Sequence, residues 1–251
     1  MKEKTSEEKG QLFELLIHDL TGPLSIASTS TDNLLHKSGR YGSLTEAQKR
    51  VIERILRNVR KAQALLHEMI EVSRSEEGIF NREGLEIKKV LKEALIDALE
   101  TSDPQMAERL IPVEDYEELQ KILRDKEIAI EMRGRYCNSP FCHDIRKVRQ
   151  ILRNLISNAL KYRRKEMRVC IQGDRDLVVS IEDDGFGIPP DAQEAVFKRF
   201  VRLRDKRCGD VPGYGLGLTG VKSLVEAMGG EITLESKEGA GTCFTIRVPS
   251  L

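Results

Sequence analysis

The feature that most constrains this chain is a change in its hydrophobic period near residue 76. Before that point apolar residues recur three and four positions apart, which is the spacing of one helix face. The stripe within residues 5–37 contains Leu12, Phe13, Leu16, Leu20 and Leu24, and the stripe within residues 44–75 contains Val51, Ile55, Val59, Leu66 and Val72. After that point short apolar runs alternate with helical patterns. We therefore predict a helical part followed by a mixed part.

Two long amphipathic helices separated by Gly39, Gly42 and Ser43 predict an antiparallel helical hairpin. A lone hairpin cannot cover its own apolar stripe. Pairing two hairpins as a four-helix bundle is the obvious remedy, so we expect a homodimer through this region. Turn-forming residues then replace the helical period. We divide the chain into a dimerisation hairpin at 1–77, a linker at 78–84 and a second domain at 85–251.

Strands and helices are mixed within the second domain, which predicts an α/β sandwich and places the whole chain in the α+β class. Strands are expected at 128–132, 169–171, 177–181, 231–235 and 243–248, and helices at 85–100, 146–162 and 218–228. The charged stretch 101–126 is predicted to hold one extra helix, at 113–124.

The charge balance argues against some classes of partner. The chain has 41 basic and 41 acidic residues, so it has no net positive charge that would attract nucleic acid or a membrane surface. No apolar run reaches the length that crosses a bilayer, and the first residues lack a secretory pattern. Five scattered cysteines argue against a disulfide framework. We expect a cytoplasmic protein with no nucleic-acid partner and no direct membrane insertion.

His18 and Asp19 lie beside the apolar stripe of the first helix, shortly before Pro23. Pro23 cannot donate a hydrogen bond to the carbonyl of Asp19 and crowds that carbonyl, which predicts a bend beside His18. The alternative is that a helix simply starts at Pro23, with Thr21 or Gly22 as its cap. Both interpretations fit the local sequence equally well.

Two glycine-rich segments of the second domain have the composition of ligand-binding loops. Asp183 follows a strand, and its carboxylate can accept a hydrogen bond from an exocyclic amine such as that of adenine. Glycines allow a backbone to approach a ligand closely, and a helix N-terminus attracts phosphate. The first segment contributes Gly185 and Gly187, and the second, which leads into the helix at 218–228, contributes Gly213, Gly215 and Gly217. Either segment alone could be an ordinary turn or a flexible loop.

Four polar residues share one face of the helix at 146–162, namely Asn154, Asn158, Lys161 and Tyr162. An amide oxygen suits a Mg²⁺ ion that keeps several waters, and a lysine suits phosphate. A solvated helix surface could show the same residues. These four residues therefore indicate a binding site only in combination with the two glycine-rich segments.

In this order, and together with Glu238-Gly239-Ala240-Gly241-Thr242-Cys243-Phe244 near the end, these segments resemble the catalytic core of the sensor histidine kinases of two-component systems. The second domain is similar to the Bergerat-fold ATPases, the group shared with the Hsp90, gyrase and MutL families. The resemblance covers residues 8–250. It implies ATP and Mg²⁺ as cofactors, and a response regulator receiver domain as partner.

The resemblance also implies roles for individual residues. Asn158 would coordinate Mg²⁺ beside Asn154, Lys161 would contact phosphate, and Tyr162 would lie against the nucleotide. Asp183 would hold the adenine amine, with Thr242 near the adenine pocket. The remaining nucleotide-binding positions would be Gly185 and Gly187, Gly213, Gly215 and Gly217, and Arg202, which would reach the phosphates from a lid at 198–212.

By the same resemblance, His18 would be the phosphoacceptor, and Asp19 would fix its tautomer and stabilise the imidazolium that develops. The phosphoramidate would then pass to an aspartate of the receiver domain. Gly22 stands four residues after His18, where the family usually has the Thr or Asn that positions water for dephosphorylating the partner. We therefore expect no strong phosphatase activity.

Other interpretations stay open. A Bergerat-fold ATPase or protein-serine kinase would not need His18, and a non-catalytic scaffold could bind nucleotide and dimerise. Separately, Cys137, Cys142 and His143 could form a zinc site, although a loop beside a strand explains them as well.

Overall fold

The computed structural model describes residues 2–75, 80–199, 201 and 215–251, of which residues 2–18, 38, 40, 64, 65 and 67–75 are described by their backbone alone. The chain divides into two compact units, Met1–Arg74 and Ser75–Leu251. Within the described residues, no helix combines the length and the apolar character needed to cross a bilayer.

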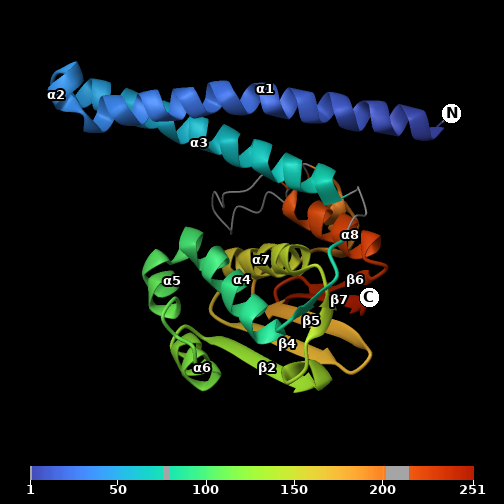
Figure 1. Ribbon diagram of the computed structural model, residues 1–251. Coiled ribbons are helices and arrows are strands. Elements are labelled where there is room, and N and C mark those ends of the chain that lie inside the picture. The colour runs from blue at the N-terminus through green and yellow to red at the C-terminus, as the bar shows by residue number, and fades with distance from the viewer. Residues whose placement is uncertain (1, 76–79, 200, 202–214) are drawn as a thin grey trace. The chain divides into compact units, whose positions relative to one another are not determined.

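The first unit is a helical hairpin. Helix α1 spans Lys2–His36, the short helix α2 spans Ser38–Tyr41, and helix α3 spans Glu46–Ser75 (Figure 1). Helix α1 continues through Pro23, so the interpretation in which a helix begins at that proline is wrong. Gly42 has a φ of 82° in the turn, a conformation that glycine adopts without a Cβ penalty.

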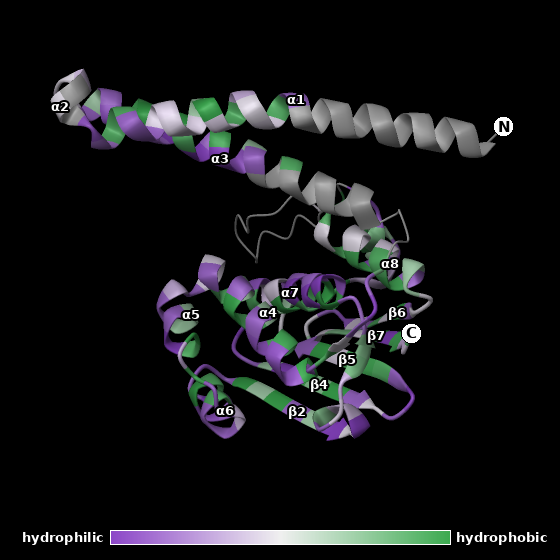
Figure 2. Ribbon diagram, viewed as in Figure 1, coloured by the Kyte–Doolittle hydropathy of each residue, from purple (hydrophilic) through white to green (hydrophobic). Residues whose placement is uncertain are grey.

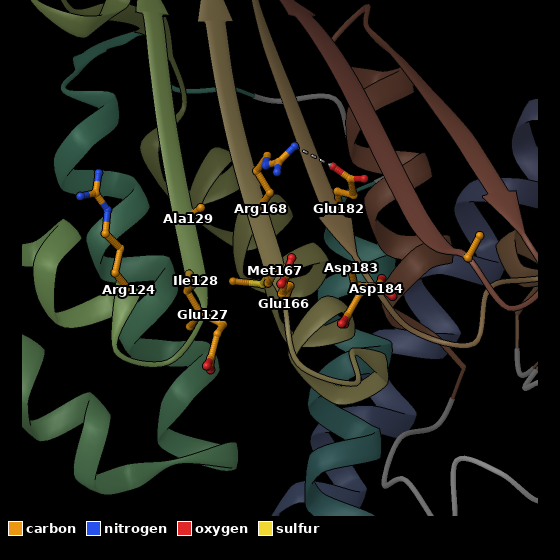
Figure 3. Close-up of a pocket in the computed structure, with 11 residues that line it drawn as sticks. Arg124, Glu127, Ile128, Ala129, Glu166, Met167, Arg168, Glu182, Asp183 and Asp184 are labelled. Atoms are coloured by element: carbon orange, nitrogen blue, oxygen red, sulfur yellow. Dashed lines mark ion pairs between the residues drawn. The ribbon is translucent and has the colours of Figure 1, made fainter.

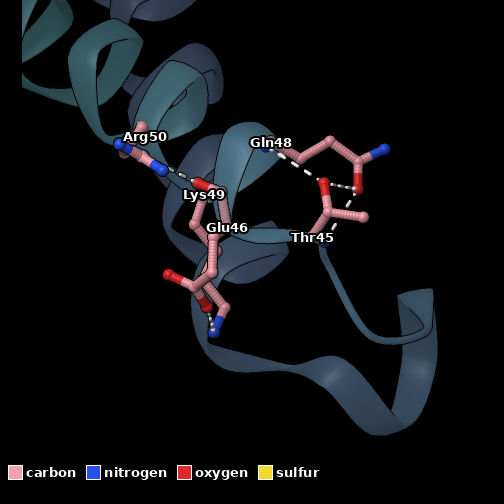
Figure 4. A network of polar contacts seen from close by, with 5 residues as sticks. All are labelled: Thr45, Glu46, Gln48, Lys49 and Arg50. Carbon is pink, nitrogen blue, oxygen red and sulfur yellow. Dashed lines mark hydrogen bonds and ion pairs between the residues drawn. The ribbon is translucent and has the colours of Figure 1, made fainter.

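Helix α3 begins where it does because Thr45 and Gln48 cap it reciprocally (Figure 4). The backbone N–H of Thr45 donates to Oε1 of Gln48 at 2.9 Å, and the N–H of Gln48 donates to Oγ1 of Thr45 at 3.3 Å. This arrangement satisfies two donors at the helix start that no helical carbonyl can reach. The local sequence therefore determines where the second arm of the hairpin starts.

The hairpin covers only part of its own apolar surface. Leu56 and Leu66 are buried, and Asp32 of α1 accepts a hydrogen bond from Nη2 of Arg60 in α3 at 3.1 Å. Hydrophobic residues nevertheless recur along both helices (Figure 2). The exposed ones are Leu20 at 51%, Ile26 at 69%, and Val51 and Ile55 at 46% each.

The second unit is an α/β sandwich built on a five-stranded sheet of order β2-β4-β5-β7-β6. The strands span Ile128–Gly134 (β2), Met167–Gly173 (β4), Asp176–Asp183 (β5), Glu231–Lys237 (β6) and Gly241–Pro249 (β7). Strand β2 pairs with β4 in parallel, and all other neighbours in the sheet are antiparallel. Helices α4 (Ile87–Ser102), α7 (Ile145–Tyr162) and α8 (Gly217–Ala227) cover one face (Figure 1).

The core forms where the apolar face of the sheet packs against the apolar faces of the helices. Alternate residues of β5, Leu177, Val179 and Ile181, are buried, as are Ile151 and Leu155 on the facing side of α7. Period-two burial on strands and three-to-four spacing on helices are what a sheet covered on one face requires. The α+β class predicted from the sequence is confirmed.

Three features add to the expected elements. Strand β1 (Glu83–Leu85), which takes in the end of the expected linker, pairs antiparallel with β3 (Phe141–His143). The stretch 101–126 holds two helices, α5 (Pro104–Leu110) and α6 (Tyr116–Arg124), where one was expected. Each begins after an aspartate whose side chain accepts a backbone N–H. Among the described residues, three short 3₁₀ helices lie at Arg135–Cys137, Pro190–Ala192 and Ala195–Phe197.

Candidate functional site

Asp183 ends strand β5 with a carboxyl group that is only 6% exposed. Its Oδ1 accepts a hydrogen bond from the backbone N–H of Gly185 at 2.9 Å. Burial raises the pKa of Asp183 to about 6, although the hydrogen bond from Gly185 acts in the opposite direction. This single bond uses one of the carboxylate's lone pairs, so the group keeps capacity to accept an N–H from a ligand. A buried carboxyl with a raised pKa is a candidate binding group.

Thr242 stands opposite Asp183 on strand β7 and is also buried. Its Oγ1 lies 3.0 Å from Oγ of Ser236, which itself donates to the carbonyl of Gly241 at 2.8 Å. Because that bond uses the Ser236 proton, the hydroxyl of Thr242 is the donor to Ser236. The N–H of Ile188 donates to Ser236 at 2.8 Å. The network therefore joins Thr242 to the end of the first glycine segment.

Gly185 and Gly187 are required by contacts within the protein. A Cβ at Gly185 would collide with the carbonyl oxygen of Tyr162, and a Cβ at Gly187 would collide with that of Lys237. Gly187 also has a φ of 70°, which disfavours any other residue. The first glycine segment thus closes against the end of α7 and against the β6–β7 turn. The glycines were expected to let the backbone approach a ligand closely. The structure adds that they also let it approach other backbone segments of the protein.

Helix α7, which carries the four polar residues, packs on strand β5. Asn154 and Asn158 are half-buried one turn apart, and Arg153 donates from Nη2 to Oδ1 of Asn154 at 3.3 Å. Lys161 is half-buried, and Tyr162 ends the helix with 37% exposure. Two amide oxygens on successive turns are hard donors of the kind that fits a hydrated Mg²⁺ ion.

The second glycine segment differs from the first. Gly215 has a φ of 73°, and Gly217 opens helix α8 with no atom within 4 Å of an added Cβ. Packing within the described residues therefore does not demand glycine at 217. Arg202, Gly213 and most of the expected lid at 198–212 lie outside the described residues.

The start of that lid segment is anchored to the domain. The hydroxyl of Thr219 in α8 donates to the carbonyl of Phe197 at 3.0 Å. The ring of Phe197 meets Phe244 of β7 edge-to-face, with centroids 6.1 Å apart. Phe197, which precedes the expected lid, is therefore fixed to both α8 and β7.

His18 and Asp19 belong to the other unit. Both lie within helix α1, and Pro23, four residues after Asp19, has no backbone N–H. Asp19 is exposed, and the side chain of His18 lies outside the described residues.

His143, the residue that prompted the zinc interpretation, has the surroundings of a core histidine. Its ring is fully buried between Phe141 and Phe80, with centroids 6.0 and 5.4 Å away. The N–H of Asp144 donates to its Nδ1 at 2.9 Å, and burial lowers its pKa. Among the described residues no cluster of three or more His, Cys, Asp or Glu side chains is placed to hold a metal ion.

A cavity of about 270 Å³ opens at the ends of β2, β4 and β5 (Figure 3). Arg168 and Glu182, paired at 3.7 Å, line it together with Asp183 and Asp184. The polar face of α7 and Thr242 do not line it. We therefore assign the candidate site to Asp183 together with Thr242 and the polar residues of α7, and not to this cavity as a whole.

Asp184 was not among the site residues predicted from the sequence. Its carboxylate accepts backbone N–H groups from the turn after α7, at Arg164 and Lys165. The only available signal was a second acidic residue next to Asp183.

Comparison with known proteins finds two family models in the chain. Residues 8–78 match the His Kinase A (phospho-acceptor) domain, and residues 143–251 match the histidine kinase-, DNA gyrase B- and HSP90-like ATPase. The first model contains His18, and the second contains Asn158, Asp183 and Thr242.

Curated relatives match nearly the whole chain. The sensor histidine kinase WalK of Bacillus subtilis is 29% identical over 99% of this chain, and the circadian input-output histidine kinase CikA of Synechococcus elongatus is 30% identical over 96%. This chain spans only 38% and 30% of their respective lengths. The crystal structure of full-length ShkA in complex with AMPPNP has a TM-score of 0.68 over 96% of this chain and 46% of that chain. At 22% identity this likeness shows a shared fold.

Proposed function

We propose, from the premise that the chain belongs to the sensor histidine kinases, that it transfers the γ-phosphoryl group of ATP to His18 and then to an aspartate of a response regulator. One observation supports this most strongly. A phospho-acceptor hairpin containing His18 precedes an ATPase domain in which a buried carboxylate, Asp183, stands beside Thr242. Neither unit alone would specify a histidine kinase.

The nucleotide side of the proposal follows from the donors and acceptors of the site. Asp183 accepts the adenine amine, whereas guanine would present a carbonyl oxygen to the same carboxylate and be rejected. Asn158, with Asn154 beside it, would hold Mg²⁺, which offsets negative charge on the phosphates when bound. Lys161 contacts phosphate, and Tyr162 lies against the nucleotide. Gly215 and Gly217 would present backbone N–H groups to the phosphates at the start of α8.

The acceptor side requires a neutral imidazole. A ring nitrogen of His18 attacks the γ-phosphorus, the new N–P bond forms as the bond to the bridging oxygen of ADP breaks, and ADP leaves. Asp19 holds the proton of the other ring nitrogen and so stabilises the imidazolium. Positioning and electrostatics supply most of the catalysis in such transfers.

A homodimer and a weak phosphatase complete the proposal. The exposed apolar residues of α1 and α3 are what a second hairpin would cover in a four-helix bundle. Gly22 offers no side chain to position water, so dephosphorylation of the partner is slow. A cytoplasmic location stays a prediction.

Labelling with γ-³²P-ATP and Mg²⁺ tests the function. We expect label that is stable to base and lost in acid, as a phosphoramidate is, and no label on the His18→Gln variant. Acid-stable label that persists on His18→Gln would support a protein-serine kinase. Nucleotide binding without any label would support a scaffold, and either result overturns the proposal.

A further inference from the structure

Asp184 ties the turn after helix α7 to the first glycine segment. Its Oδ1 accepts the N–H of Arg164 at 2.9 Å and of Lys165 at 3.0 Å, and its Oδ2 accepts that of Lys165 at 3.1 Å. In return, the N–H of Asp184 donates to the carbonyl of Glu166 at 3.3 Å. Four hydrogen-bond contacts therefore join one residue to three consecutive residues of the turn.

The charge of Asp184 is maintained by these contacts. Burial alone would raise its pKa, but the N–H groups of Lys165, Glu166 and Arg164 hold the pKa below its ordinary value. Hydrogen bonds to an ionised acceptor are about twice as strong as those between neutral groups. The tie is thus fully formed at neutral pH.

A second contact joins the same two segments. The guanidinium of Arg164 lies over the ring of Phe186, 4.8 Å from its centroid. Phe186 stands between the two glycines of the first segment, and its carbonyl accepts the N–H of Gly239 at 2.7 Å. The basic residue after α7 therefore reinforces the connection that Asp184 makes through the backbone.

These contacts set the distance between the two halves of the proposed nucleotide site. Tyr162 is the last residue of α7, just before the turn. Asp183 and Gly185 are the sequence neighbours of Asp184 in the segment that the turn contacts. The carbonyl of Tyr162 occupies the space that a Cβ of Gly185 would need, so the segments touch at van der Waals range. If the turn moved, Asp183 would lose its fixed position relative to α7.

We propose that Asp184 is a positioning residue that holds Asp183 in register with helix α7 for nucleotide binding. This inference rests on the proposed function. Asp184 need not touch the nucleotide, because it acts through the backbone of residues 164–166 and through Asp183.

Substitution at Asp184 tests the inference. In Asp184→Ala all three accepted bonds are lost, and we expect about tenfold weaker binding of AMPPNP with Mg²⁺ and a similar rise in the KM for ATP. The kcat of autophosphorylation should change little, because Asp184 acts on Asp183, the proposed adenine-binding residue, and has no proposed contact with the γ-phosphoryl group. In Asp184→Asn the Oδ1 acceptor is retained, so binding should return to within about threefold of wild type.

Asp115→Ala is the matched control. Asp115 also accepts a backbone N–H, that of Glu118 at 3.1 Å, but it caps helix α6. We expect its loss to lower thermal stability and to leave the KM unchanged. A purely structural role of Asp184 would reproduce this pattern, with less folded protein and no rise in KM.

The outcomes separate the inference from the function on which it rests. Failure of the folded wild-type chain to bind AMPPNP removes both. A folded Asp184→Ala variant that binds as tightly as wild type overturns the inference alone. If Asp184→Ala does not fold, Arg164→Ala decides, because it removes only the ring contact and should raise the KM by about threefold. An unchanged KM in that variant also overturns the inference.

Discussion

At the scale of single residues, Asp183 shows how a binding group reduces stability. Its folded-state pKa of about 6 lies above the ordinary aspartate value of 3.8, so the folded chain binds this proton more tightly than the unfolded chain does. Stability from this group is therefore fully present below pH 4 and is lost as the pH rises through 6. Residues kept at such a cost are commonly functional.

Asp183→Asn should therefore stabilise the domain and prevent it from binding ATP. Removing the buried charge should raise the free energy of unfolding at pH 7.5 by on the order of 2 kcal/mol, and the gain should vanish near pH 4. Urea unfolding at both pH values, with AMPPNP titration at pH 7.5, checks this. A variant that is less stable at pH 7.5 and still binds AMPPNP contradicts our assignment of Asp183.

Gly22 supports a prediction about phosphatase activity. No atom lies within 4 Å of a Cβ added at this position, so a larger side chain fits on the described hairpin. We expect the wild type to release little phosphate from a phosphorylated receiver domain, and Gly22→Thr to release it several-fold faster. Gly22→Ala is the control, because it gains helix propensity but no hydroxyl. Equally brisk release by wild type and Gly22→Ala would show that this position does not limit the activity.

At the scale of elements, the two glycine segments serve different purposes. Gly185 and Gly187 admit neighbouring backbone, so any side chain there disrupts the fold. Gly217 begins helix α8 beside open space. The described residues leave the space beside Gly217 open, and we propose that glycine at this position serves ligand binding.

Gly217→Ala should separate folding from binding. Alanine favours a helix over glycine by up to about 1 kcal/mol, so the thermal midpoint should rise or stay the same. Affinity for AMPPNP should fall, because the added methyl group obstructs the approach of phosphates to the start of α8. An unchanged affinity for AMPPNP in this variant would show that Gly217 has no role in nucleotide binding.

The elements also show what a sequence can predict. The long helices and the five strands of the main sheet follow from periodic patterns, and the structure confirms them with shifted ends. Strands β1 and β3 have three residues each, too few for a period, and they pair only through a long-range contact. Helix α5 was signalled by Asp103 and Pro104, a cap followed by a proline in the first turn, but it has only seven residues.

The same contrast holds for the candidate site. The resemblance implied that Asp183 and Thr242 lie near one pocket, and the structure adds that they are register partners on β5 and β7 and that both are buried. The role of Asp184 could not be predicted because its partners are backbone N–H groups, which nearly every residue type has. The packing role of Gly185 and Gly187 likewise depends on carbonyl groups far along the chain.

At the scale of the whole molecule, the exposed apolar residues of the hairpin call for a partner surface. Ile55→Glu places a charge among them and should shift the mass measured by light scattering from that of a dimer to that of a monomer. Ile111→Glu is the control, since Ile111 is 58% exposed but lies in the other unit. A monomeric wild type, or a dimer that resists Ile55→Glu while Ile111→Glu dissociates it, contradicts the hairpin interface.

We propose that the γ-phosphoryl group of an ATP molecule whose adenine is held by Asp183 reaches His18 in the other unit. Mapping the phosphorylated residue by mass spectrometry after incubation with ATP and Mg²⁺ tests it most directly. We predict a single phosphohistidine at His18 in the wild type and none in Asp183→Asn. Phosphate on another residue, or full modification of His18 in Asp183→Asn, would contradict the account.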